Sequence, residues 1–206
     1  MIRTVVFDIG NVLADFDYPT YIHKMFTDEE VISHINNAIW LTGCWKDLDR
    51  GEDTKAVFRR MMETEPDYQD EVKKTMDGIG ECIIRMDYSI PWIQSLKDRG
   101  YQVLYLSNYS YNTMKANREA LDFLPYMDGG VFSCEIRSIK PEAKIYRTLF
   151  EKYSLDPGSC VFIDDMKENL EAAETFGMKT IQFCNYDQAK EELEKLLSEN
   201  GKAGKK

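Results

Sequence analysis

Five short apolar segments, separated by stretches of different character, most constrain how this chain can fold. Each segment is about four residues long, which is typical of a buried strand. Helical patterns separate the later segments, so strand and helix alternate over the second half of the chain. This alternation requires right-handed crossovers and predicts an α/β fold, a doubly wound parallel five-stranded sheet with helices on both faces. The predicted strands are 4–7, 103–106, 130–133, 160–163 and 180–183, and the predicted helices are 112–121, 142–153, 167–176 and 188–198.

The interval from about residue 18 to residue 86 breaks the alternation, because it has no convincing strand. Thr27 and Glu30 have the spacing of a capping box at the start of a helix. An apolar stripe predicts a helix over 55–64, and 72–85 has a weaker helical pattern. We therefore expect a helical cap inserted after the first strand. The expected domains are an α/β catalytic core of 1–16 and 88–200, a helical cap of 17–87 and a flexible tail of 201–206.

Polar side chains follow the predicted strands at the points where the strands end. Ligands of open parallel sheets bind at this carboxyl edge, so these side chains are expected to share one site. Several carboxylates cannot crowd together without a compensating cation, and Mg²⁺ is a natural one. A lysine can hold phosphoryl oxygens, and an aspartate can attack phosphorus. The pattern therefore favours phosphoryl transfer at a site made of Asp8, Ser107, Asn108, Lys140, Asp164 and Asp165.

These segments resemble the four motifs of the haloacid dehalogenase superfamily of phosphatases, in the same order and on the same elements. The cap between the first and second motifs resembles the subfamily with the first type of cap. Within that subfamily, the Asp-x-Gly-Asn-Val form and the cap segment Leu48–Glu52 resemble the bacterial glucose-1-phosphate phosphatase branch. The matching segments are Phe7–Val12, Leu106–Asn108, Ser138–Pro141, and Phe162–Asp165 with Asn169.

The resemblance implies a Rossmann-like sheet with the five predicted strands in the order 5-4-1-2-3. It also implies that Asp8 is the nucleophile, and that Ser107 and Lys140 are catalytic residues that hold the transferring phosphoryl group. The remaining implied roles concern ligands of the substrate and of Mg²⁺. Substrate and phosphate would contact Ile9, Gly10, Ser107, Asn108, Lys140 and, from the cap, Arg50. Mg²⁺ would be held by Asp8, the Gly10 carbonyl and Asp165, and by Asp164 through water or by support of the direct ligands.

One position departs from the family pattern. Most phosphatases of this family carry an aspartate two residues after the nucleophile as the general acid and base, and here that position is Gly10. Asp15 and Asp17 lie nearby and could substitute, or they could be solvated residues at the hinge into the cap. Without an acid, the rate should depend steeply on how well the leaving oxygen bears charge. Because an anomeric oxygen bears charge better than a primary alkoxide, this favours a sugar-1-phosphate.

Composition excludes several other classes of partner. The chain has 26 basic and 36 acidic residues, and its net charge of −10 repels phosphate backbones and anionic lipid. We therefore expect neither nucleic acid nor membrane as a partner. The five cysteines are odd in number and dispersed, which favours reduced thiols over a disulfide framework or a zinc site. No apolar leader precedes the first strand, so we expect a cytoplasmic protein. The oligomeric state, a monomer or a weak dimer, stays open at this point.

The sequence thus predicts a Mg²⁺-dependent phosphomonoester hydrolase that acts through an aspartyl-phosphate on a small phosphorylated metabolite, with a sugar phosphate favoured. Two alternatives stay open at this point. The missing acid at Gly10 is compatible with a phosphate-sensing or catalytically impaired regulatory protein of the same fold. A metal-independent haloacid dehalogenase could use Asp8 against carbon, but it would leave the acidic pair Asp164-Asp165 unexplained.

Overall fold

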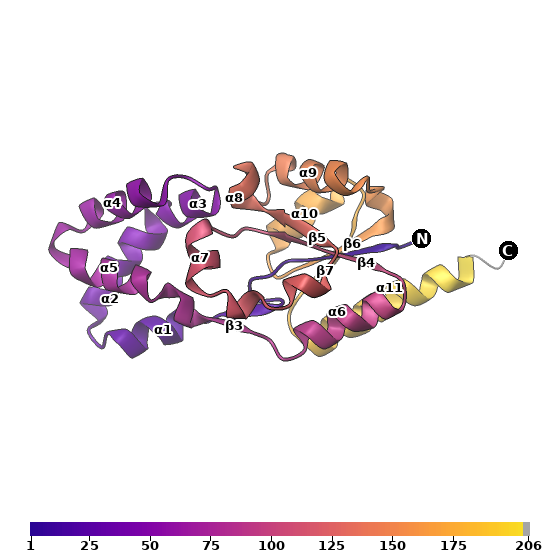
Figure 1. The fold of residues 1–206 in the computed structure, drawn as a ribbon, viewed down its shortest axis with the longest axis horizontal. Coiled ribbons are helices and arrows are strands. Elements are labelled where there is room, and N and C mark those ends of the chain that lie inside the picture. Colours follow the sequence, from indigo (N-terminus) through magenta and orange to yellow (C-terminus); the bar gives the residue numbers. More distant parts are fainter. Residues whose placement is uncertain (204–206) are drawn as a thin grey trace.

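A parallel sheet of five strands forms the centre of the computed structural model, which describes residues 1–203 (Figure 1). The strands lie in the order β5-β4-β1-β6-β7 and confirm both the predicted α/β class and the predicted order. β1 sits between β4 and β6, where the chain switches from one half of the sheet to the other. The five strands are β1 (Thr4–Phe7), β4 (Gln102–Ser107), β5 (Gly129–Phe132), β6 (Cys160–Asp164) and β7 (Lys179–Gln182).

Helices cover both faces of this sheet, as the strand–helix alternation predicts (Figure 1). The side chains of β1 alternate between the two layers. Val5 and Phe7 belong to the apolar cluster that includes α6 and α11, whereas Val6 belongs to the cluster that includes α9 and α10. β1 is therefore buried on both sides. The helices of this part of the chain are α6 (Ser89–Asp98), α7 (Tyr111–Ala116), α8 (Ser133–Ile136), α9 (Ala143–Tyr153), α10 (Lys167–Glu174) and α11 (Tyr186–Ala203).

A group of helices between β1 and β4 lies beyond the carboxyl edge of the sheet (Figure 1). We call residues 17–82 the helical insert. Its apolar residues share one cluster with the α6 and α11 face of the sheet, so the insert is packed on the rest of the molecule. Its helices are α1 (Tyr18–Met25), α2 (Glu29–Asn36), the π-helix Asn37–Leu41, α3 (Cys44–Asp49), α4 (Thr54–Thr64) and α5 (Gln69–Asp77).

A two-stranded ribbon joins the insert to the sheet domain, and the sequence analysis missed it. β2 (Ala14–Phe16) pairs antiparallel with β3 (Ile83–Arg85), and Phe16 lies opposite Ile83. The expectation of no strand between residues 18 and 86 is therefore wrong. Three residues are too few to show a period of two, and the partner strand lies far away in sequence. The helix predicted over 72–85 is also wrong in its second half, because α5 ends at Asp77 before Gly78.

Smaller differences have local causes. Asp28, rather than Thr27, caps α2, because its carboxylate accepts a hydrogen bond from the Glu30 N–H at 2.9 Å. The helix predicted over 112–121 splits after α7, where the Asn117 side chain donates to the carbonyls of Gly80 and Ile83. The short 3₁₀ segments are Pro66–Tyr68, Ile79–Cys82, Glu119–Leu121, Leu124–Tyr126 and Pro157–Ser159.

The C-terminal end differs in part from the predicted flexible tail. α11 extends to Ala203, so the first residues of the predicted tail are helical, and 204–206 lie outside the described residues. Within residues 1–203, no helix combines the length and the apolar character that crossing a membrane requires.

Candidate active site

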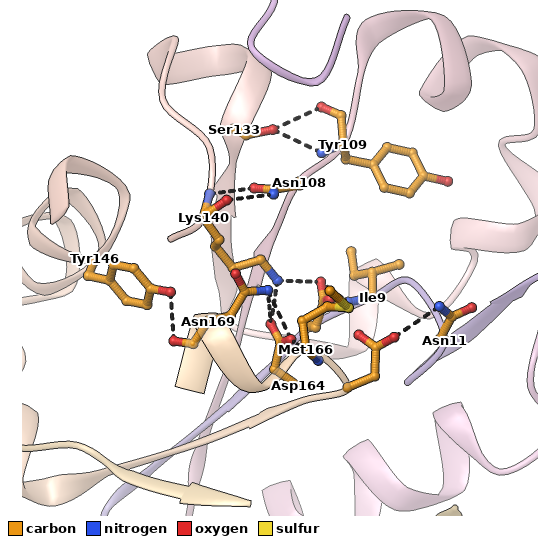
Figure 2. Close-up of polar contacts among 12 residues, drawn as sticks. Ile9, Asn11, Asn108, Tyr109, Ser133, Lys140, Tyr146, Asp164, Met166 and Asn169 are labelled. Carbon is orange, nitrogen blue, oxygen red and sulfur yellow. Dashed lines mark hydrogen bonds and ion pairs between the residues drawn. The ribbon is translucent and has the colours of Figure 1, made fainter. Parts of the chain in front are cut away.

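A buried ion-pair cluster lies at the carboxyl edge of the sheet, around β1 (Figure 2). The Lys140 Nζ is 2.8 Å from Asp8 Oδ1 and 2.6 Å from Asp164 Oδ2. Asp8 follows β1, Asp164 ends β6, and Lys140 lies in the loop after α8. All three residues are buried. A buried charge cluster of this kind is costly unless its charges compensate one another, which makes it a candidate functional site.

Asn108 fixes the backbone of Lys140. Its side-chain oxygen accepts from the Lys140 N–H at 2.7 Å, and its amide nitrogen donates to the Lys140 carbonyl at 3.1 Å (Figure 2). The sequence predicts Asn108 as a phosphate ligand and does not indicate this contact with the Lys140 backbone. Ser107, the last residue of β4, is buried and its hydroxyl hydrogen-bonds the Asp8 carboxylate.

The loop after β1 turns tightly around its own backbone. The Ile9 carbonyl accepts from the N–H groups of Val12, Leu13 and Ala14, and Asn11 takes a left-handed conformation with φ of 56°. The turn directs the Ile9 N–H to Asp8 Oδ1 at 2.7 Å. It also brings the Asn11 side chain to Asp165 Oδ2, with a nitrogen-to-oxygen distance of 3.0 Å (Figure 2). The loop thereby connects Asp8 to the acidic pair after β6.

Burial controls the charges of the cluster. It raises the pKa of the Asp8 carboxyl to about 7, because it outweighs the opposing charge of Lys140 and is reinforced by Asp164. Burial alone would lower the pKa of Lys140, but the two carboxylates outweigh it and raise that pKa above its ordinary value. Burial also raises the pKa of Asp165, against the hydrogen bond from Asn11. A further cation at this site would relieve the repulsion among the carboxylates.

The donor atoms fit a hard divalent cation. One carboxylate oxygen from each of Asp8, Asp164 and Asp165 lies within 4.8 Å of the others. Asp164 is already engaged, because it accepts from Lys140, from the Met166 N–H and from the Asn169 side chain (Figure 2). It therefore fits a supporting role better than that of an open ligand. The oxygen donors of Asp8 and Asp165 match the preference of Mg²⁺ for carboxylate oxygen.

A cavity of about 490 Å³ opens above this cluster, between the sheet edge and the helical insert. We call its sheet side the floor, which includes Asp8, Gly10, Lys140 and Asp165. We call its opposite side the wall, which is largely apolar and aromatic. The wall is made mainly of Phe16, Trp40, Trp45, Lys46, Asp49 and Tyr109.

Asp49 is a candidate site residue that sequence reasoning did not single out. It is the last residue of α3, it lines the cavity, and it is 8% exposed. Burial, followed by the negative charge of Asp8, raises the pKa of the Asp49 carboxyl to about 8. The segment Leu48–Glu52 resembles one branch of phosphatases. Nothing in the sequence, however, indicates that the Asp49 carboxyl faces Asp8.

Comparison with known proteins decides the family. The model of the haloacid dehalogenase-like hydrolases matches residues 2–177, which include four of the five strands of the sheet, the floor and the insert. This chain belongs to the haloacid dehalogenase-like hydrolases. The family assignment confirms the resemblance seen in the four strand-end motifs, and it makes the chain a hydrolase.

The similarity to individual proteins is low or covers only part of this chain. Mouse bifunctional epoxide hydrolase 2 is 39% identical over 71 residues, which are 34% of this chain but only 13% of that protein. The D-ribitol-5-phosphate phosphatase of Bacteroides thetaiotaomicron is 22% identical over 96% of this chain and 100% of its own length. A family enzyme from the same organism, solved with magnesium and inorganic phosphate, has a TM-score of 0.68 at 21% identity, covering 88% of this chain and 94% of that one. At this identity the structural likeness shows the fold.

Of the three further candidate residues, Arg50, Asp15 and Asp17, two do not line the cavity. Arg50 does not line the cavity, and its Nη1 forms an ion pair with Glu142 Oε1 at 2.7 Å. Asp17 caps α1 by accepting from the Thr20 N–H at 3.1 Å, and it too is absent from the cavity lining. Asp15 lies on β2 and lines the cavity, half-buried. Of the two aspartates near Gly10, only Asp15 therefore faces the site.

Proposed function

We propose that this chain is a phosphomonoester hydrolase whose nucleophile is Asp8. The observation that carries the proposal is the buried Lys140 amine held between Asp8 and Asp164 at the carboxyl edge of the sheet. A dehalogenase would gain nothing from a third carboxylate, that of Asp165, next to this pair. In a phosphatase, the same carboxylate would help to hold a second cation, which would stabilise the negative charge of the phosphoryl group.

In the proposed reaction, an Asp8 oxygen attacks phosphorus and the ester oxygen leaves, which forms an aspartyl-phosphate. Lys140 and the Ser107 hydroxyl hold the phosphoryl oxygens in line for this attack. Asp164 keeps Lys140 charged and aimed, while Asn108 holds the Lys140 backbone. Asp8, the Gly10 carbonyl and Asp165 would hold Mg²⁺, which when bound neutralises phosphoryl charge.

The helical insert would serve as a cap. It supplies the wall of the cavity and connects to the sheet domain through the narrow β2–β3 ribbon. Closing such an element over the substrate excludes bulk water from the reacting atoms.

For the substrate we propose a small phosphorylated metabolite, with sugar and polyol phosphates favoured. Support comes from the full-length likeness to a ribitol-5-phosphate phosphatase and from the size of the cavity. The narrower preference for a sugar-1-phosphate depends on the cavity having no proton donor in place of Gly10.

The test is a phosphate-release assay on p-nitrophenyl phosphate and a panel of sugar phosphates, with Mg²⁺ and with excess chelator. We expect turnover of at least one ester in Mg²⁺ and none in chelator. Failure to release phosphate from every ester in Mg²⁺ would contradict the proposal.

A further inference from the structure

We propose that Asp49, on the wall of the cavity, is the proton donor to the leaving oxygen and does the work that the side chain at position 10 cannot do. The assignment rests on the proposed phosphatase function. It makes the helical insert a source of a catalytic residue in addition to a cover.

The cavity has free space at Gly10. A Cβ atom added there would meet no heavy atom within 4 Å. Lack of space therefore does not force position 10 to be glycine. The backbone conformation does not force it either, because φ at this position is not in the left-handed range. The cavity lining includes both Gly10 and Asp49, so a carboxyl from the opposite side can serve the same space.

Three consecutive residues hold the end of α3 against the sheet domain. The Ser133 hydroxyl donates to the Asp49 carbonyl at 2.5 Å. Arg50 forms its ion pair with Glu142. Gly51, with φ of +81°, packs so closely that an added Cβ would lie 2.4 Å from the Cys134 carbonyl oxygen. These contacts fix the position of Asp49 relative to the floor, which a general acid requires.

Burial and the charge of Asp8 favour the neutral form of Asp49, against the opposing influence of Lys140 and Trp45. Asp8 repels its charge across the cavity, and Lys140 attracts it from the same side. The Trp45 indole is a hydrogen-bonding neighbour on α3 itself, and Tyr109 and Cys134 face it from the sheet domain. Burial is the largest influence and holds the proton on the carboxyl near neutral pH. A neutral carboxyl beside the nucleophile is what protonation of a leaving alkoxide needs.

In the proposed mechanism, Asp49 donates a proton in the first step and accepts one in the second. As an Asp8 oxygen bonds to phosphorus, the ester P–O bond breaks, its electron pair stays on the leaving oxygen, and that oxygen takes the proton from Asp49. The Asp49 carboxylate then accepts a proton from a water molecule. The oxygen of that water bonds to phosphorus, the bond to Asp8 breaks, and inorganic phosphate leaves.

The experiment compares Asp49→Asn with Asp47→Asn in Mg²⁺. Asp47 lies on the same helix but pairs with Arg60 at the surface, outside the cavity. For glucose-6-phosphate, whose leaving group needs a proton, we expect Asp49→Asn to lower kcat/KM by about 10²–10⁴-fold. For p-nitrophenyl phosphate, whose leaving group does not, we expect a full burst of nitrophenolate, one per active site, followed by slow turnover. Asp47→Asn should leave both unchanged.

Two further measurements separate proton donation from a structural role. The alkaline limb of the glucose-6-phosphate pH profile should disappear in Asp49→Asn. Adding Gly10→Asp to that variant should recover at least about tenfold of the lost rate, because a carboxyl returns to the open space. The parent enzyme should cleave glucose-1-phosphate and glucose-6-phosphate at rates within about tenfold of each other.

The outcomes are distinguishable. Absence of any ester cleavage by the parent enzyme would overturn the phosphatase proposal, and the assignment of Asp49 with it. With an active parent, loss of the nitrophenolate burst in Asp49→Asn, or an unchanged rate on glucose-6-phosphate, would overturn the assignment alone. The assignment would also be overturned if Asp15→Asn, rather than Asp49→Asn, selectively lost activity on glucose-6-phosphate.

Discussion

The floor and the wall of the cavity are built in different ways. On the floor, charged side chains come from the ends of neighbouring strands and contact one another, with Lys140 between Asp8 and Asp164. Of the six named wall residues, four come from the insert and four are aromatic, and the buried Tyr109 hydroxyl has no hydrogen-bond partner among the described residues. The ion pairs of the floor are thus made within the protein, whereas the wall keeps a buried polar group that a ligand could engage.

The difference separates two tasks. In the proposed reaction the phosphoryl group is the same in every substrate, so a fixed set of charges can hold it. The leaving group varies, and an apolar wall with few polar atoms can select among shapes. Changes on the floor should therefore abolish chemistry on all substrates, and changes on the wall should act differently on different substrates.

The largest effect is expected on the floor from Asp8→Asn. The amide keeps the shape and can still accept from Lys140, but it cannot attack phosphorus. We expect turnover to fall by on the order of 10⁴-fold or more on every ester, with the circular dichroism spectrum unchanged. Retention of more than a few per cent of activity would mean that the nucleophile is another group.

Lys140→Ala comes next. Loss of one preorganised donor should lower kcat by about 10²–10³-fold on all esters. It also leaves Asp8 and Asp164 buried without their cation, so the free energy of unfolding should fall by about 3–5 kcal/mol. Both quantities are measurable, by kinetics and by urea titration at pH 7. An unchanged kcat would remove Lys140 from the site.

Asp165→Ala tests the proposed cation site. Excess chelator should abolish the activity of the parent enzyme, and added Mg²⁺ should restore it. In the variant, a carboxylate oxygen is missing, so we expect half-maximal activity to need about 10–100-fold more Mg²⁺. Lys167→Ala, an exposed change on the neighbouring helix, is the control. Equal Mg²⁺ dependence of the Asp165 variant and the parent would rule out Asp165 as a ligand.

A change on the wall should have a smaller and substrate-dependent effect. Trp40 lines the cavity and packs on Tyr18 and Trp45, with ring-centroid distances of 4.9 and 4.5 Å. Trp40→Ala removes apolar contact with the leaving group, so KM for the preferred ester should rise about tenfold. Inhibition by inorganic phosphate, which contacts the floor, should change less than about twofold. A parallel loss of phosphate binding would show that the two regions are not separable.

The smallest expected effect is on stability. The pKa of Asp49 is raised to about 8 in the folded chain, whereas an unfolded aspartate titrates near its ordinary value of 3.8. The folded state therefore holds a proton that the unfolded state loses, and stability falls as pH rises through this window. Asp49→Asn removes that dependence, so we expect the variant to be more stable than the parent at pH 8 by more than about 1 kcal/mol. At pH 4 the difference should shrink, as thermal unfolding at both pH values can show.

The sequence predicts the floor of the cavity better than the wall. The sheet and the strand-end motifs follow from short apolar runs and from the polar residues directly after them, whereas the strand order follows from the resemblance to the family. The β2–β3 ribbon could not be predicted, since each strand is three residues long and pairs with a distant segment. The inward direction of Asp49 and the outward ion pair of Arg50 depend on how α3 packs against α8 and its neighbours. Their adjacent positions in sequence carry no such information.

The narrow β2–β3 ribbon has a consequence for protein engineering. Because Phe16 lies opposite Ile83, both ends of the helical insert leave the sheet domain side by side. We expect a foreign helical module with equally close ends, and with an apolar face that replaces the packing of the insert, to be accepted between residues 16 and 83 without a change in the order of the five parallel strands. Such chimaeras would keep one hydrolytic half-site and exchange the other, so libraries of spliced modules could redirect the same chemistry to new esters.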